Sequence, residues 1–466
     1  MMRKRSTHSV VAASRRDVLV GTAATLALGP LGSSLAQAAP PQTLTAAPGE
    51  ARLHPDASRI TKVWSYNAGT PGPVLRARRG ERIDVRLANM LPQPTTVHWH
   101  GIRIDNAMDG VPHLTQHAVE PGAGFDYSFV VPDAGTFWYH PHERSYEQVA
   151  RGLTGALVVE EETPPDYDRD LVLFLSDWRL KKDGSLDERF GTPHDRAHAG
   201  RLGNVITVTG KPDPDLPIAR NERIRIRIVN AASARIFRLR FEGLNARLIA
   251  IDGQPVAPTS GYDEGLTLAP GNRADLIVDG LGEPGTVFPI VDLRGKRAEI
   301  ARLVVSEAEP VRATPLASPI ELAPNGLMMP ELSQAKLVDL VMTGGAKNET
   351  DMSIMSKGDK IWALNGKSGM DETPLFTLKR NQSVAVRLRN ETAWPHGMHF
   401  HGHHFRIIAR GDGKPVSDYL WDTVLMEPKD DVTIAFAGDN PGRWMIHCHM
   451  LDHQPVGMDT WFEVAG

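Results

Sequence analysis

The sequence predicts an all-β protein built from three β-sandwich domains. Beyond the N-terminal 38 residues, short β-branched runs alternate with glycine and proline, of which the 466-residue chain has 42 and 35. Long stretches of helical periodicity are few, as is typical of a mostly β fold. One alternating segment also recurs three times at domain-sized intervals, so each copy is expected to mark one domain.

The recurring segments are ERIDVRLAN, ERIRIRIVN and QSVAVRLRN, which end at Asn89, Asn230 and Asn390. Chance is the alternative explanation, since alternating strands are common in β proteins. We expect similar domains instead, followed in one case by a segment rich in proline and alanine. The expected division is 45–162, 168–308 and 335–466 for the domains and 309–334 for the linker.

Residues 1–38 are predicted to be an export signal of the twin-arginine type. Arg15 and Arg16 precede an apolar run, and a small-residue cleavage site ends at Ala38. An ordinary basic start is the alternative. No later stretch approaches about 18 uninterrupted apolar residues, so we expect no membrane span in the mature chain and a periplasmic or secreted location.

The net charge bears on nucleic-acid binding, and the cysteine content bears on disulfides and metal ligands. The formal net charge is -4, and its spread along the chain argues against nucleic acid as a partner, because phosphate binding needs clustered basic residues. The single cysteine, Cys448, cannot form an internal disulfide. It is either a buried apolar residue, a metal ligand or a nucleophile.

Histidines two residues apart occur in four segments, in the first and last expected domains. In extended backbone, residues two apart point to the same face, so each pair can present two imidazoles to one point. Neutral imidazoles suit copper, zinc, iron or nickel, and eight of them exceed the needs of one ion. We therefore expect several metal ions held by His98, His100, His140, His142, His399, His401, His447 and His449.

The same alternation separates Cys448 from its neighbours. Because His447 and His449 face one way, Cys448 faces the other, toward a second site within the third domain. His396 lies an odd number of residues before His399, so it can reach that second site.

His453 and Met458 complete the set at this second site. Two imidazoles, one thiolate and a weak axial thioether are the signature of an electron-transfer copper site. The middle domain has Leu239 and Phe241 where the other domains have histidine pairs, so we expect it to hold no metal.

The segments HWHG, WYHPH, HGMHFHGH and HCHMLDHQPVGM resemble the four copper motifs of the multicopper oxidases, which include laccases, bacterial spore-coat oxidases, copper-efflux oxidases and ascorbate oxidase. The resemblance covers the whole mature chain, with the motifs in the expected order. It implies cupredoxin-like Greek-key β-sandwich domains and four copper ions: one type 1, one type 2 and two type 3.

The resemblance also implies the ligands of each ion. Type 1 copper is expected on His396, Cys448, His453 and Met458. Type 2 copper is expected on His98 and His399. The type 3 pair is expected on His100, His140 and His449 and on His142, His401 and His447, and which triad serves which ion stays open.

The implied reaction is one-electron oxidation of a reductant at type 1 copper, with transfer through Cys448 and four-electron reduction of dioxygen to water. A phenolic reductant is favoured, and an easily oxidised phenol over a refractory one, because Met458 should keep the type 1 potential at the lower or middle part of the family's range. Oxidation of Cu(I) for copper tolerance is the main alternative, since thioethers bind cuprous ion. Methionine is also ordinary core filler, and no dense motif unites Met328, Met329, Met342, Met352, Met355 and Met370. Manganese as reductant and a non-catalytic copper-binding or cell-division scaffold are further alternatives.

Three aspartates are candidates for supporting roles. Asp109 resembles the acid that the family places beside the cluster, although an Asp-Gly pair is also a common turn. Gln454 stands where many bacterial members have a glutamate, and an amide cannot exchange a proton. Proton supply is therefore expected from Asp109, Asp452 or water, and Asp452 could equally cap a turn. For Asp422 a strand-edge carboxylate is favoured over a partner of a ligand imidazole.

The other histidines outside the signal match no ligand position of the family. We expect surface or structural roles for His54, His113, His117, His194, His198, His403 and His404. Trp99 and Phe400, each between two histidines, are expected to pack in the sandwich interior.

Overall fold

Six β-sheets contain nearly all regular structure of the described part of the chain, which confirms the all-β prediction. The computed structural model describes residues 42–260, 262, 264–317, 321–348, 360–411, 413, 416 and 418–466. The predicted export signal, Met352 and Met355 lie outside these residues. Among the described residues, no helix has the length and apolar character needed to cross a bilayer.

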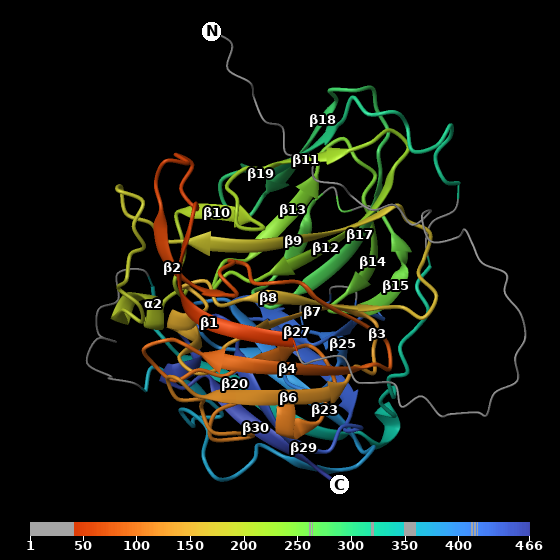
Figure 1. The fold of residues 1–466 in the computed structure, drawn as a ribbon. Coiled ribbons are helices and arrows are strands. Elements are labelled where there is room, and N and C mark those ends of the chain that lie inside the picture. The colour runs from red at the N-terminus through yellow and green to blue at the C-terminus, as the bar shows by residue number, and fades with distance from the viewer. Residues whose placement is uncertain are drawn as a thin grey trace, which may run out of the picture. The chain divides into compact units, whose positions relative to one another are not determined.

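The first two sheets come from residues 42–160. One has the strand order β2 (Thr61–Tyr66), β1 (Gln42–Ala51), β4 (Arg82–Asn89), β6 (Gly124–Val130). The other has the order β3 (Leu75–Arg78), β8 (Gly155–Glu160), β7 (Gly135–His140), β5 (His98–His100). Trp99 packs in the core between them with Tyr127 and Phe137, as predicted. In Figure 1, β4 and β6 are the adjacent orange arrows.

The next two sheets come from residues 169–305. One has the order β10 (Val205–Val208), β9 (Arg169–Trp178), β12 (Arg223–Asn230), β17 (Arg273–Asp279), β14 (Arg247–Ile251), β15 (Gln254–Thr259). The other has the order β11 (Asp215–Ile218), β19 (Ala298–Val305), β18 (Val287–Asp292), β13 (Phe237–Phe241), β16 (Leu266–Leu268). Leu239 is buried in their core, and Phe241 packs against it.

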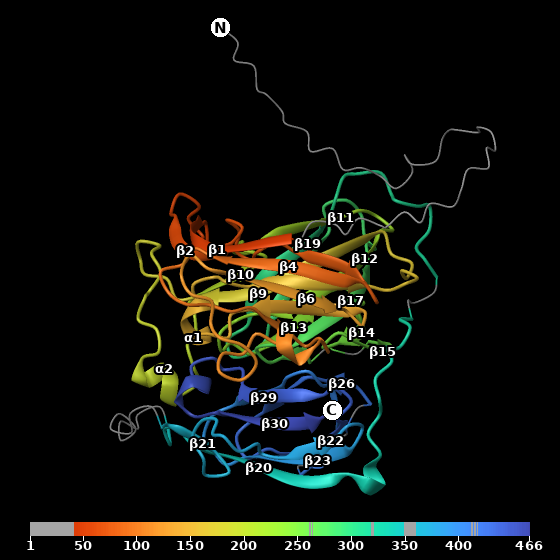
Figure 2. The same ribbon diagram turned by 60° about the horizontal axis from the view of Figure 1, so that its bottom comes forward.

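The last two sheets come from residues 336–465. One has the order β21 (Trp362–Leu364), β20 (Lys336–Gly344), β23 (Ser383–Asn390), β28 (Asp431–Ala437), β25 (Phe405–Arg410), β26 (Leu420–Trp421). The other has the order β22 (Thr377–Lys379), β30 (Asp459–Ala465), β29 (Gly442–Cys448), β24 (His396–Phe400), β27 (Thr423–Met426). Phe400 is buried in their core. Figure 2 shows β29 beside β30, both in blue.

Helices are short in the described residues. The α-helices are α1 (Ser145–Gln148) and α2 (Pro193–Ala197). The 3-10 helices are η1 (Asn106–Met108), η2 (Leu332–Gln334) and η4 (Gln454–Val456).

The three recurring segments form equivalent central strands. Each of β4, β12 and β23 pairs in parallel with an earlier long strand on one side and antiparallel with a later strand on the other. The asparagine that ends each one closes the following turn with its side chain. Asn89, Asn230 and Asn390 each donate to two or more later carbonyls and accept from the backbone N–H two residues on. This repeated geometry accounts for the repeated sequence.

Pro41–Gly466 is one unit by its internal contacts, so the three domain boundaries stay a prediction.

Candidate metal centre

Two antiparallel strand pairs bring the predicted ligand histidines together. β5 pairs with β7 so that His98 lies opposite His140. β24 pairs with β29 so that His399 lies opposite His447. All eight histidines of the four pairs, hereafter the histidine cluster, are buried. The cluster thus draws equally on the first and third sheet pairs.

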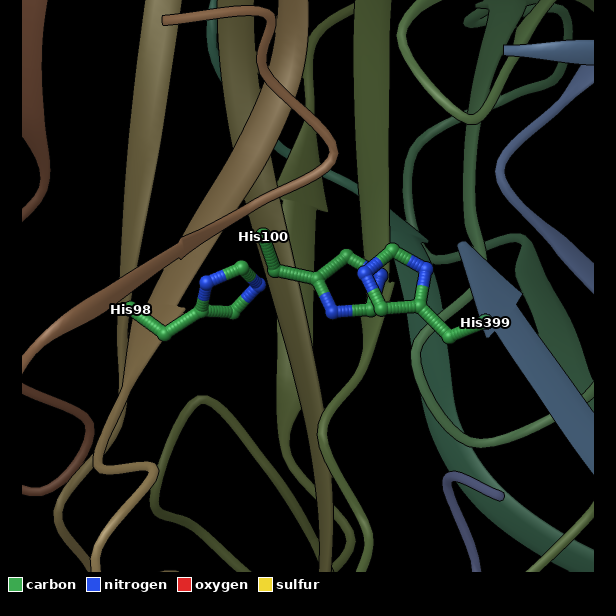
Figure 3. A group of neighbouring side chains, drawn as sticks. All are labelled: His98, His100 and His399. Atoms are coloured by element: carbon green, nitrogen blue, oxygen red, sulfur yellow. The ribbon is translucent and has the colours of Figure 1, made fainter. Parts of the chain in front are cut away.

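Three groups of three imidazoles converge within the histidine cluster. In each group, one nitrogen from every ring lies within 4.8 Å of the other two. The groups are His98, His100 and His399; His100, His140 and His449; and His142, His401 and His447. Figure 3 shows the first group, with the ring of His98 directed toward those of His100 and His399. The latter two rings are stacked at a centroid distance of 3.7 Å.

Several nitrogens of the histidine cluster are buried without any hydrogen-bond partner. Leaving a buried polar atom unpaired costs about 1–3 kcal/mol, so such atoms call for a ligand. They are His98 Nε2, His100 Nδ1, His140 Nε2, His399 Nε2 and both ring nitrogens of His449. In the third group, His447 Nε2 lies 3.1 Å from His401 Nε2 and 3.3 Å from His142 Nε2. This set of donors therefore fits the binding of copper ions.

In three of these rings, the second nitrogen forms a hydrogen bond with a backbone carbonyl oxygen. His98 Nδ1 donates to the carbonyl of Asp109 at 2.8 Å, and His399 Nδ1 donates to that of Asp422 at 2.9 Å. His140 Nδ1 donates to its own neighbour's carbonyl at 2.9 Å. Metal-binding histidines generally donate in this way, because the bond fixes the tautomer and the ring orientation.

Burial also keeps the imidazoles in their neutral, metal-binding form. It is the main reason that the pKa values of His100, His140 and His449 lie well below the ordinary value. Neighbouring imidazoles lower them further, because two positive rings so close together repel each other.

A second, smaller site surrounds Cys448. Its Sγ lies 3.5 Å from His396 Nδ1 and 3.6 Å from His453 Nδ1, and the two nitrogens are 3.2 Å apart. These separations suit three donors around one ion, because nitrogen and sulfur ligands lie about 2.0–2.3 Å from a transition metal. We call these three residues the cysteine site. Met458 is buried beside it, and its carbonyl accepts a hydrogen bond from Cys448 N at 3.0 Å.

Strand alternation works as predicted at this point of the chain. His447 and His449 each belong to a group of the histidine cluster, whereas Cys448 between them belongs to the cysteine site. Burial raises the pKa of the Cys448 thiol to about 12, so a metal ion must displace the thiol proton in order to bind.

A segment that follows β9 in the chain covers the cysteine site. His453 Nε2 donates to the carbonyl of His198 at 2.8 Å. Trp362 Nε1 donates to the carbonyl of Arg196, and Ala346 N donates to that of Ala197. We call residues 193–201 the covering segment. The sequence predicts surface or structural roles for His194 and His198, but it does not predict that this segment covers the cysteine site. A capped helix start at Thr192 is visible in the sequence, but nothing there indicates what α2 covers.

Asp109 lies between two groups of the histidine cluster. Its Oδ2 is 2.8 Å from His401 Nδ1, and its Oδ1 is 3.2 Å from His98 Nδ1. The Asp-Gly turn and the place in the site are therefore not alternatives. Gly110 has φ +77°, and a Cβ on it would lie 1.9 Å from Val97 O, so the close turn that aims Asp109 requires glycine.

Asp452 is buried but faces the covering segment. Its Oδ2 accepts a hydrogen bond from Arg201 N at 3.1 Å. Burial first, and then the carboxylate of Asp195, raise the pKa of Asp452 to about 7. Among the hydrogen bonds and ion pairs of the described residues, none links Asp452 to a predicted ligand, which favours the alternative of a structural cap.

Gln454 has a carboxylate partner that the sequence analysis misses. Its Nε2 donates to Asp459 Oδ2 at 3.1 Å. Burial raises the pKa of Asp459 to about 6. Both residues line a hollow of about 430 Å³, together with His142 of the histidine cluster and Met370.

The sequence favours a strand-edge carboxylate at Asp422 over a partner of an imidazole, and this expectation is wrong. Asp422 lies between two strands, as a strand-edge residue would, but it is fully buried and its Oδ1 is 3.3 Å from His100 Nε2. Among the remaining histidines, His198, His403 and His404 are buried, and the groups with metal-binding geometry found in the described residues include none of the seven.

The matches to known proteins agree with this geometry. Residues 49–164, 169–302 and 338–466 each match a family model described as multicopper oxidase. Multicopper oxidase MmcO from Mycobacterium tuberculosis is 31% identical, over 86% of this chain and 83% of that protein. Laccase-2 from Fomitopsis schrenkii is 29% identical, over 83% of each chain.

Solved structures give the same result. The multi-copper oxidase from Pseudomonas Thermotolerans has a TM-score of 0.81 at 34% identity, over 91% of this chain and 98% of that one. Three consecutive family models span most of the sequence, and a relative at 31% identity matches 86% of it. The chain therefore belongs to the multicopper oxidase family, which implies an oxidoreductase with four copper ions.

Proposed function

We propose that this oxidase takes single electrons from a phenolic reductant at the cysteine site and uses four of them, with four protons, to reduce one dioxygen to two waters at the histidine cluster. The observation that carries the proposal is the position of Cys448 between His447 and His449. One short stretch of β29 belongs to both sites, so electrons have a short covalent route between them.

We assign the ligands as the convergence of donors supports. Type 1 copper would be held by the cysteine site together with Met458, which is buried next to Cys448. Type 2 copper is held by His98 and His399. The type 3 pair is held by two triads: His100, His140 and His449, and His142, His401 and His447. Bound copper supplies one-electron acceptance at the first site and dioxygen reduction at the other three ions.

The protein's own groups hold these donors and supply protons. Asp109 accepts from His401 Nδ1 and so fixes that ring, and its carboxylate is the acid nearest the cluster that we propose passes protons to it. Burial of the rings keeps bulk water from competing for the donor nitrogens. Asp452 contributes by anchoring Arg201 of the covering segment.

A phenol is preferred as reductant over Cu(I). Similarity to Laccase-2 supports it. Among phenols, Met458 favours easily oxidised ones, because a thioether keeps the type 1 potential moderate. Of the six methionines that suggest cuprous ion, Met342 is fully buried in the core, and Met328 and Met329 are exposed beyond the sheets. Cuprous ion stays the second candidate because His453 Nε2 already donates to the carbonyl of His198 and so is not free to hydrogen-bond a phenol.

We also propose that the protein acts in the periplasm or outside the cell after twin-arginine export. The support is the pair Arg15 and Arg16 with the apolar run that follows it.

Oxygen uptake by the four-copper protein decides between the reductants. It is measured with a dimethoxyphenol and with Cu(I), each with and without added Cu(II). The proposal expects uptake with the phenol that does not need added Cu(II), and none in Cys448→Ser. Uptake with Cu(I) alone would replace the phenol by cuprous ion, and uptake that persists in Cys448→Ser would reject the electron route.

A further inference from the structure

Arg273 forms a buried two-point ion pair with Asp422 beside the histidine cluster. Arg273 begins β17 in the middle sheet pair, and Asp422 lies between β26 and β27 in the last. Nη1 donates to Asp422 Oδ1 at 2.9 Å and Nη2 donates to Asp422 Oδ2 at 2.5 Å. Both side chains are fully buried. A planar guanidinium matches a carboxylate in this way, whereas an ammonium group cannot form both bonds in fixed geometry.

Asp422 passes this restraint to two imidazoles. His100 Nε2 donates to Asp422 Oδ1 at 3.3 Å, and His399 Nδ1 donates to the carbonyl of Asp422 at 2.9 Å. The other nitrogens of these two rings, His100 Nδ1 and His399 Nε2, are buried without a partner and face the cluster. The direction in which these rings present their free nitrogens therefore depends on where Asp422 is held.

Further contacts fix Arg273 itself. Its Nε donates to Thr136 O at 3.2 Å and its Nη1 to Gly271 O at 3.0 Å. Asp252 accepts from Arg273 N at 2.9 Å and from Asp422 N at 3.1 Å, so it joins the two backbones as well.

The glycine of HWHG makes room for the ion pair. A Cβ on Gly101 would lie 2.1 Å from Arg273 Nη2 and 2.5 Å from Asp422 Oδ2. The motif that carries two predicted ligands thus also clears the space in which Arg273 and Asp422 meet. All three sheet pairs contribute to this contact.

We propose that Arg273 is a positioning residue for the trinuclear copper centre: it holds the Asp422 carboxylate in place and thereby aims His100 and His399 at their copper ions. The proposal rests on the ligand assignment made above. It extends the role of the middle domain, which supplies no ligand, to the orientation of ligands from both other domains.

The test compares Arg273→Lys with Arg225→Lys. Arg225 is an equally buried arginine on the neighbouring strand β12, and its carboxylate partners are Asp275 and Glu161. Both variants keep the positive charge but lose the planar guanidinium that forms two parallel hydrogen bonds with a carboxylate. Copper is titrated into copper-free protein, and copper atoms are counted per blue type 1 centre, so misfolded chains do not contribute. Electron paramagnetic resonance reports the type 2 ion separately.

Arg273→Lys is expected to keep the blue band but to bind copper at the histidine cluster roughly 10–100-fold more weakly, with an altered type 2 signal. Arg225→Lys is expected to keep the wild-type affinity and signal. If Arg273→Lys binds all four ions with the wild-type affinity and type 2 signal, or if Arg225→Lys shows the same loss, the proposal is overturned.

Two further measurements complete the design. Wild-type protein must give four copper atoms per chain and a blue band; a shortfall there rejects the ligand assignment rather than the role of Arg273. If Arg273→Lys has no blue band at all, Asp422→Asn takes its place. That variant is expected to lose affinity selectively at the histidine cluster, and wild-type affinity in it overturns the proposal.

Discussion

Replacement of Asp109 by asparagine should slow oxygen reduction without affecting electron entry. The substitution preserves the shape of the side chain, but it removes the negative charge that lies 2.8 Å from His401 Nδ1 and the ability to exchange a proton. Loss of such an outer partner costs about 10–100-fold, and loss of a positioned acid costs about 100–10,000-fold. We expect a decrease of roughly 100–1,000-fold in the reaction with oxygen, or about 3–4 kcal/mol in the barrier.

The two half-reactions are measured separately by stopped flow. Bleaching of the blue band by a phenol without oxygen reports electron entry at the cysteine site, where Asp109 is not among the donors. Return of the blue band on mixing with oxygen reports the reaction at the histidine cluster. Asp109→Asn should match the wild type in the first measurement and be slower in the second.

The matched control is Asp105→Asn. Asp105 lies on the same loop, is exposed, and accepts a hydrogen bond from Ala107 N instead of a histidine. It should behave as the wild type in both half-reactions. An unchanged rate with oxygen in Asp109→Asn, or an equal slowing of both half-reactions, would refute the proposed role of the carboxylate.

Three further predictions concern the cysteine site and the middle domain. Cys448→Ser should lose the blue band and phenol oxidation but still bind about three copper ions, as counted by elemental analysis; a retained blue band would contradict the site. Met458→Leu should stay blue with a higher type 1 potential in a redox titration, because a weak donor is lost; a lower potential would exclude the axial role. Burial opposes ionisation of Asp275, yet Arg225 and Arg227 hold its pKa below the ordinary 3.8, so its stabilisation is present above about pH 4 and is lost as the pH falls through the folded-state pKa. Asp275→Asn should therefore destabilise copper-free protein at pH 7 by ~3–5 kcal/mol, and its melting temperature should fall less steeply than that of the wild type as the pH is lowered. An unchanged melting temperature at pH 7 would argue against this ion pair.

The grouping of the histidine and cysteine side chains could be predicted closely from the sequence, because it depends on the alternation of side chains along an extended strand. Alternation through the end of β29 and the residue that follows it sends Cys448 one way and His447 and His449 the other, and the structure brings each to the site that alternation predicts. The repeated asparagines also mark equivalent strands, since each closes the same turn with its side chain. Which residues bind copper stays a proposal, but their grouping was foreseeable.

Supporting contacts were foreseen less well. The sequence favours a strand-edge carboxylate at Asp422, yet the residue is fully buried and contacts Arg273 and His100. Met342, one of the methionines that suggested a cuprous site, is core filler. In both cases, burial among distant segments decides the role of the residue.

The sequence by itself determined the β class, the repeated strands and the two sets of donors, because the spacing of side chains along an extended strand is a property of the backbone alone. Only the tertiary structure decided that Arg273 of the middle sheet pair lies beside the histidine cluster and that the covering segment lies beside the cysteine site. Arg273 meets Asp422 across 149 residues, and the carbonyl of His198 meets His453 across 255. Such contacts depend on how sheets from different parts of the chain pack together, and no local periodicity specifies that packing.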